Sequence, residues 1–188
     1  MKLLESIKDM FYHRHLKKQQ NLDSTQRELT SFQEARKIGM LLKLGKADNE
    51  LESILQYNGE LTKSHKEVEL LAYSDTKTVP EGFDFDIFCQ KDLNFRKIPK
   101  GEKVTRFMNT SYDMLIALHR ESVQPLEYIS LRSKARCRIG YFRPQADVYY
   151  DLMLHTQLEG IEPYIAQVRS FLKKMNKKST LHNNEFSV

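Results

Sequence analysis

Residues 112–142 have the sequence YDMLIALHRESVQPLEYISLRSKARCRIGYF, in which two short apolar runs flank a segment with helical features. The first run, Met114–Leu118, shows no alternation of polar and apolar residues, which is typical of a strand covered on both faces. Pro125 stands where a helix would begin, and Cys137–Phe142 is again strand-like. A strand, a helical crossover and a second strand predict a parallel βαβ unit with helices on both faces of its sheet.

A second unit of the same kind lies earlier in the chain. Lys37–Leu44 and Val68–Tyr73 are expected strands, and the helix between them begins at Asp48 and carries an apolar stripe. We therefore expect one α/β domain with a single, mostly parallel sheet of about four to six strands and flanking helices, a Rossmann-like arrangement.

Shorter elements complete the expected domain. Phe85–Cys89 and Tyr149–His155 are expected strands and candidates for antiparallel edges, because neither follows a clear helical crossover. Val104–Met108 is a further strand candidate. Ser24–Glu28 resembles the start of a capped helix, and Ile161–Met175 is expected to close the domain as an amphipathic helix.

The order YDMLIALH followed by SKARCRIGY resembles part of the acceptor-side, Rossmann-like half of the heptosyltransferase-type glycosyltransferases. In those enzymes a strand that opens with Asp is followed by a strand of the type Arg-Arg-(Ile/Val)-Gly-(Phe/Tyr). The resemblance implies a fold and no catalytic residue, because the Gly-Asp turn that carries their proposed base would fall after Leu42, where this chain reads KLGKADNELE. From Leu22 to Met175 the chain also resembles a family of α/β proteins of unknown function from Bacteroidota bacteria, with a basic amino-terminal arm.

Asp113 resembles the Asp that opens the equivalent strand of those glycosyltransferases. In this chain it follows Asn109, Thr110 and Ser111, a context typical of a turn. We expect its carboxylate to accept hydrogen bonds from neighbouring backbone amides, which is a structural role.

The composition is that of a globular protein, since 40% of the 188 residues are hydrophobic and 10% are aromatic. The chain has no apolar run long enough to span a membrane, and Glu5 and Asp9 interrupt the apolar residues at its start. Neither a transmembrane segment nor a secretory signal is expected, and the default compartment is the cytoplasm. Cys89 and Cys137 show no metal-ligand pattern, so we expect buried free thiols and no metal site.

Residues 1–21 are predicted to be a basic amphipathic arm that precedes a domain at residues 22–175 and a mobile tail at residues 176–188. Lysines and arginines flank the apolar face of the arm. This docking face is expected to bind a protein partner or an anionic membrane surface, which would place the protein peripherally at the inner membrane. The face consists of Leu3, Leu4, Ile7, Met10 and Phe11.

The net charge of +5 and the pI near 9.1 are unevenly distributed along the chain. Besides the arm, a basic cluster without any acidic residue lies in residues 128–146. It is a candidate anion-binding site for lipid headgroups or RNA, and the alternative is a solvated surface. Its members are Arg132, Lys134, Arg136, Arg138 and Arg143. Arg136 and Arg138 alternate along one strand face, which requires partners or an edge position.

The sequence contains no GxGxxG, GxxxxGK[ST], GxSxG or HExxH motif, so no cofactor and no catalytic residue is predicted. The remaining signal is positional, because open parallel sheets bind ligands beyond the carboxyl ends of their strands. The polar residues expected at this rim are Asp75, His119, Glu121 and His155. His119 and His155 can do acid–base work if they face each other, or they can be polar strand ends.

Two functions fit these features. The first is a non-enzymatic interaction module whose basic arm docks on an anionic surface or on a partner protein. The alternative is a small ligand-binding or transferase-like domain that uses the rim at the strand ends. Stabilisation by nucleotides, sugar nucleotides or phosphorylated metabolites would favour the alternative.

Overall fold

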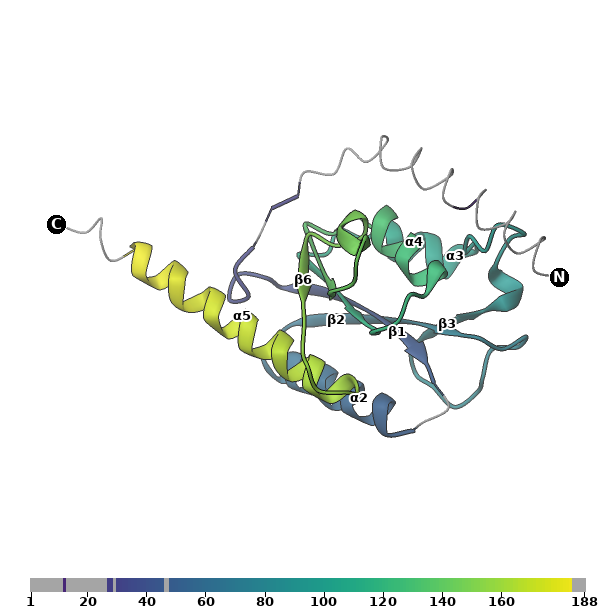
Figure 1. Cartoon of the computed structure of the whole chain (residues 1–188), viewed down its shortest axis with the longest axis horizontal. Coiled ribbons are helices and arrows are strands. Elements are labelled where there is room, and N and C mark those ends of the chain that lie inside the picture. The colour runs from purple at the N-terminus through teal and green to yellow at the C-terminus, as the bar shows by residue number, and fades with distance from the viewer. Residues whose placement is uncertain (1–11, 13–26, 29, 46–47, 184–188) are drawn as a thin grey trace.

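The computed structural model describes residue 12 and residues 27–28, 30–45 and 48–183 (Figure 1). Within these ranges the chain forms one six-stranded sheet with helices between its strands. The elements follow in the order β1 (Lys37–Leu44), α2 (Asp48–Lys63), β2 (Glu67–Ser74), β3 (Asp86–Cys89), α3 (Glu102–Asn109), β4 (Met114–Leu118), α4 (Gln124–Arg132), β5 (Cys137–Tyr141), β6 (Leu152–Leu154) and α5 (Ile161–Asn183). Two short 3-10 turns lie at Gln90–Asp92 and Ala146–Val148.

All neighbouring strands are parallel, and the strand order is β3-β2-β1-β4-β5-β6. The sheet therefore consists of two halves that wind outward from the central β1–β4 pair, one through β2 and β3 and the other through β5 and β6. This is the strand order of the doubly wound Rossmann arrangement. The predicted fold class is confirmed.

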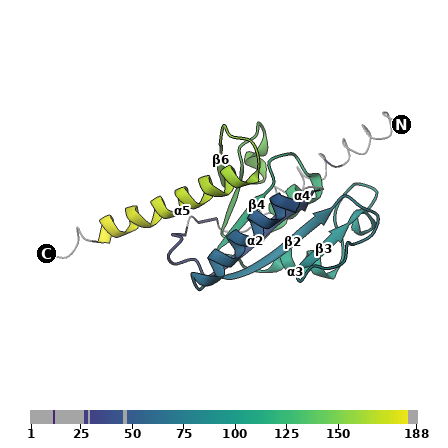
Figure 2. The same ribbon diagram turned by 90° about the horizontal axis from the view of Figure 1, so that it is seen from below.

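Helices cover both faces of the sheet (Figures 1 and 2). α2 and α5 lie side by side on one face, while α3 and α4 cover the other. Successive strand residues point to opposite faces, so Met40 and Ile116 pack toward α2 and α5, whereas Leu41 and Leu115 pack toward α3 and α4. Every residue of β4 is buried, which explains why this strand has no polar residue.

The ring of Tyr150 fills the space beside Gly140 in β5. A Cβ atom at Gly140 would lie 2.4 Å from ring atoms of Tyr150, which is closer than real side chains pack. Tyr150 is buried in an apolar cluster that also contains Tyr128, Leu131 and Tyr149. Glycine at position 140 therefore allows the segment after β5 to fold back onto that strand.

Both edge strands, β3 and β6, run parallel to their neighbours, so the expectation of antiparallel edges is wrong. The segments before them, residues 75–85 and 142–151, contain no α-helix. A parallel connection needs enough chain to return to the opposite end of the sheet, and an irregular segment supplies that length here.

Three further differences concern helices. Val104–Met108, a strand candidate, lies in α3, where the spacing of the buried Val104 and Phe107 suits one helical face. No helix starts in the described part of Ser24–Glu28, and the residues that follow form a turn at 32–34. α5 continues to Asn183, through part of the predicted tail.

Tyr12 connects the predicted arm to the domain. The docking face of the arm, at positions 3, 4, 7, 10 and 11, lies outside the described residues. Tyr12 itself is only 1% exposed and packs in the apolar cluster that contains Tyr150. Its hydroxyl donates a hydrogen bond to the carbonyl oxygen of Gln124 at the start of α4, over 2.7 Å. The predicted boundary at residue 21 therefore separates Tyr12 from its own packing partners.

Among the described helices, none is both long and apolar enough to cross a bilayer. Cys89 and Cys137 are buried and free, which confirms the prediction for the two thiols.

Candidate functional site

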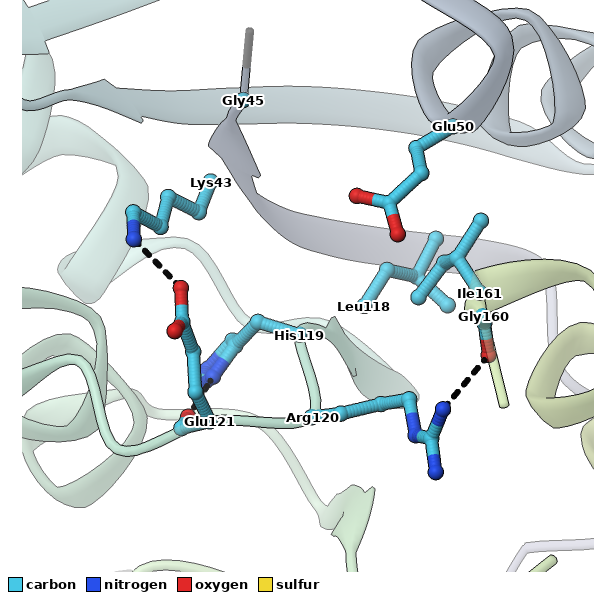
Figure 3. Close-up of a pocket in the computed structure, with 9 residues that line it drawn as sticks. All are labelled: Lys43, Gly45, Glu50, Leu118, His119, Arg120, Glu121, Gly160 and Ile161. Carbon is cyan, nitrogen blue, oxygen red and sulfur yellow. Dashed lines mark hydrogen bonds and ion pairs between the residues drawn. The ribbon is translucent and has the colours of Figure 1, made fainter. Parts of the chain in front are cut away.

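A cavity of about 330 Å³ lies at the carboxyl ends of β1 and β4, where the strand order reverses (Figure 3). The helix that follows β1 packs on one face of the sheet, and the helix that follows β4 packs on the other. Because these two connections diverge, a crevice forms between them, and ligands of doubly wound sheets bind at this point. The cavity is lined by Lys43, Gly45, Glu50, Leu118, His119, Arg120, Glu121, Gly160 and Ile161.

Lys43 and Glu121 form an ion pair at one side of the cavity (Figure 3). Lys43 is the penultimate residue of β1, and Glu121 lies in the turn after β4. The Glu121 side chain is 62% exposed and that of Lys43 is 31% exposed. Such a solvent-exposed pair contributes about 0–1 kcal/mol to stability, so the fold does not depend on it.

Arg120 lines the opposite side of the cavity (Figure 3). Its Nη1 donates to the carbonyl oxygen of Gly160 over 3.3 Å, and its Nη2 donates to the hydroxyl of Tyr141 over 3.2 Å. The guanidinium carbon lies 5.0 Å from the centre of the Tyr141 ring, a cation–π contact. Among the described residues, no carboxylate forms an ion pair with Arg120, and its Nε is buried without a hydrogen-bond partner.

Both ring nitrogens of the buried His119 are engaged by the protein. Nδ1 lies 2.9 Å from the carbonyl oxygen of Glu121, so Nδ1 carries the proton and donates. Nε2 therefore accepts a hydrogen bond from the Tyr150 hydroxyl, over 3.2 Å. Burial lowers the pKa of His119 from 6.5 to about 4, which keeps the ring neutral. His119 thus holds the turn after β4, and neither nitrogen is available as an acid or a base.

Two helices begin beside the cavity. α2 begins at Asp48, and the carboxylate of Glu50 in its first turn points toward Leu118 and Ile161 (Figure 3). α5 begins at Ile161, directly after Gly160, whose φ of +91° favours glycine. The amino-terminal ends of helices carry partial positive charge and unpaired backbone N–H groups.

The four predicted rim residues do not form one site. His119 and Glu121 line the cavity, but Asp75 and His155 do not. Asp75 follows β2 and accepts hydrogen bonds from the side chains of Gln90, over 2.8 Å, and Tyr73, over 3.3 Å. His155 follows β6, and its ring packs against the ring of Tyr141.

The predicted basic cluster is largely paired with carboxylates. Arg138 is 6% exposed and binds Asp151 through two nitrogens, with distances of 2.7 and 3.0 Å. Arg143 lies 2.7 Å from the buried Glu127, and Arg136 forms an ion pair with Glu28. Arg138 in β5 and Arg136 directly before this strand thus have the partners that their spacing required.

The other two members of the cluster differ in exposure. Arg132 is half-buried at the end of α4, and Lys134 is exposed. Anion binding by the five residues together stays a prediction.

Sequence reasoning did not identify Glu50, Arg120 or Gly160 as site residues. Arg120 adjoins the predicted His119, but Glu50 and Gly160 come from the starts of two helices far apart in the chain. Only the strand order brings these helices to the same edge of the sheet. Together the charged lining side chains comprise Lys43, Arg120, Glu50 and Glu121.

This arrangement suits recognition of a small polar molecule. The two cations offer donors to anionic groups, the two carboxylates accept hydrogen bonds, and Leu118 and Ile161 supply apolar contact. Within the part of the chain that the structure describes, no three His, Cys, Asp or Glu side chains are grouped so as to hold a metal ion.

Comparison with known proteins places the chain in a family. No curated protein matches the sequence. The profile of one family, described as a family of unknown function (DUF6913), matches residues 8–175. The match includes Tyr12 and every residue that lines the cavity. The chain therefore belongs to DUF6913, a family of unknown function.

Proposed function

We propose that the domain is a binding module for a small polar metabolite, which it holds in the cavity between the carboxyl ends of β1 and β4. The observation that carries this proposal is the coincidence of the cavity with the reversal of strand order. Doubly wound folds bind ligands at this place, because the connections diverge there. A volume of about 330 Å³ lies at the lower end of the range for small-molecule sites.

Binding is supported better than catalysis. His119, the lining residue best suited to proton transfer near neutral pH, is occupied by Glu121 and Tyr150. Glu121 and Lys43 contribute little to the core, since their side chains are partly exposed. These two side chains are therefore available to a ligand.

A thermal-shift screen tests this proposal, with nucleotides, sugar nucleotides and phosphorylated metabolites as probes. A ligand at a hundredfold excess over its dissociation constant should stabilise the fold by about 2.7 kcal/mol. Stabilisation by sugar nucleotides in particular would extend the resemblance of residues 112–142 to glycosyltransferases into a transferase-like role. If no class of probe stabilises the fold, the proposal is contradicted.

A blocking variant assigns the response to the cavity. Glu50 is exposed on α2 and its side chain points into the cavity, so Glu50→Trp should fill the site without disturbing the core. Glu52→Trp, at an exposed position of the same helix outside the cavity, is the matched control. Ligand stabilisation should disappear in the first variant and persist in the second.

A second candidate function is the interaction module, in which the basic arm docks on lipid headgroups, RNA or a partner protein, peripherally at the inner membrane. The specific observation in its favour is Tyr12, whose side chain ties the end of the arm to the domain at α4. A docking segment attached in this way would hold the domain at the surface that the segment binds.

Vesicle co-sedimentation tests the second candidate. The full-length chain should bind anionic but not neutral vesicles and should dissociate as salt rises, whereas residues 12–188 should not bind. Equal binding by both forms would rule out the docking face of the arm as the anchor and would point to the cluster of Arg132, Lys134, Arg136, Arg138 and Arg143. Binding of RNA but not vesicles would identify a nucleic-acid partner.

A further inference from the structure

Arg120 differs from the arginines that form ion pairs. Among the described residues, five arginines contact a carboxylate, namely Arg106, Arg136, Arg138, Arg143 and Arg169. The hydrogen-bond partners of Arg120 are instead a carbonyl oxygen and a phenol, and it lines the cavity. Within the described ranges, no carboxylate is therefore in direct contact with the Arg120 guanidinium.

The guanidinium of Arg120 is also held in place. The hydrogen bond to the Gly160 carbonyl and the stacking on the Tyr141 ring fix its plane, and the side chain is half-buried. A fixed, partly desolvated guanidinium presents donors that match the geometry of phosphate and carboxylate groups. Such a group binds an oxyanion with little loss of side-chain entropy.

Lys43 supplies a second positive charge that a ligand can recruit. Its ion pair with Glu121 is exposed on the Glu121 side, so the pair is weak and can be exchanged for another anion. Glu121 then acts as an internal counter-ion that occupies Lys43 while the cavity is empty. The charges of Lys43, Arg120, Glu50 and Glu121 sum to zero, so removal of one carboxylate leaves a net positive site.

We infer that the ligand of this cavity carries an oxyanion, a phosphate or a carboxylate, that binds Arg120 and displaces Glu121 from Lys43. The start of α5 beside Gly160 adds backbone N–H groups to the same end of the cavity. Glu50 faces the remaining space and accepts hydrogen bonds from a hydroxyl or ammonium group of the same ligand. This inference rests on the proposed function, whose ligand it assigns to a chemical class.

Titration of the full-length chain with sodium phosphate and with sodium acetate tests the inference. Sodium chloride keeps the ionic strength constant, and the shift of backbone amide resonances reports binding. At least one of the two oxyanions should bind, and the stronger of the two identifies the group as a phosphate or a carboxylate. Glu121→Gln should tighten binding by about fivefold, because it frees Lys43 and leaves a net positive cavity.

Arg120→Gln should weaken binding by roughly tenfold, because it removes the fixed guanidinium. Arg36→Gln makes the same charge change at an exposed position before β1, outside the cavity and outside the predicted basic cluster, and is the matched control. Arg120→Lys keeps the charge without the planar fork, and it should recover part of the lost affinity if the first variant is folded. Equal weakening by Arg120→Gln and Arg36→Gln, or no effect of Glu121→Gln, would overturn the inference.

Two further outcomes separate the inference from the proposed function. Glucose and ethanolamine serve as uncharged and cationic probes under the same conditions. If either binds in the cavity while both oxyanions fail, the ligand class is wrong and the binding function stands. If none of the probes binds and the metabolite screen is also negative, both proposals are wrong.

Discussion

Tyr150 donates a hydrogen bond to Nε2 of His119, and the two atoms are 3.2 Å apart. Tyr150 comes from the segment between β5 and β6, whereas His119 directly follows β4, so the contact ties two neighbouring connections together. Because the opposite ring nitrogen donates to the Glu121 carbonyl, the imidazole is a buried neutral bridge.

The state of His119 predicts how stability depends on pH. The pKa of His119 is about 4 in the folded protein and has its ordinary value of 6.5 in the unfolded chain, so the unfolded chain binds more protons between these values. This contribution to the free energy of unfolding is fully present above pH 6.5 and is lost as pH falls toward 4, by roughly 3 kcal/mol in total. Urea unfolding at a series of pH values measures it.

The control for this prediction is His119→Gln. The variant should be less stable at pH 7 and should lose less stability between pH 6.5 and 4 than the natural chain. A parallel decline in both proteins would show that other groups cause the pH dependence.

Replacement of glycine by alanine should have opposite effects on stability at positions 140 and 59. Gly140→Ala would place a Cβ 2.4 Å from the Tyr150 ring, so it should lower the free energy of unfolding by about 1–3 kcal/mol. Gly59 lies within α2, and a Cβ atom added there would meet nothing within 4 Å, so Gly59→Ala should raise the free energy of unfolding by about 1 kcal/mol. Denaturant titration compares them, and destabilisation by both variants would contradict the packing described here.

The burial of Tyr12 limits how much of the arm can be removed without destabilising the domain. Tyr12→Ala should cost about 3–5 kcal/mol, as for other large buried aromatic side chains, whereas Tyr12→Phe should cost about 1 kcal/mol through its hydrogen bond to Gln124. Residues 12–188 should therefore melt close to the full-length chain, and residues 22–188 well below it. Equal melting temperatures for the two truncated forms would show that Tyr12 does not support the domain.

Asp113 joins two central strands. Its Oδ2 accepts hydrogen bonds from the backbone N–H groups of Arg36, over 2.8 Å, and Lys37, over 3.0 Å, at the start of β1. The expected structural role is present, but the amides come from the neighbouring strand and not from the local turn. Asp113→Ala should lower the free energy of unfolding by about 1–3 kcal/mol, because it leaves both donors without this acceptor. A variant of unchanged stability in urea unfolding would refute this role.

The central strands could be predicted because their burial on both faces leaves a distinct local pattern. Met114–Leu118 shows it directly. α3 could not be recognised, because Val104 and Phe107 are too few to separate a helical period from a short strand. The direction of the edge strands depends on irregular crossovers, whose path is not encoded in any periodicity.

The candidate site was predictable only in part for a related reason. A position directly after a strand, such as His119 or Glu121, can be read from the sequence, and both residues line the cavity. The strand order decides which strand ends are neighbours, and it follows from long-range packing. For this reason Asp75 and His155 lie elsewhere on the rim, and Glu50 and Gly160 join the cavity from the starts of α2 and α5.

The function proposed for the domain requires that a small molecule binds between the carboxyl ends of β1 and β4. A ¹H–¹⁵N NMR titration of the full-length chain, with the compound that gives the largest thermal shift, tests it most directly. Binding there should give saturable shifts for the amides of Gly45, Arg120 and Gly160, which line the cavity. Saturable shifts confined to Gly59 and Phe83, in the separate groove beside β2, with no change at the first three amides, would contradict it.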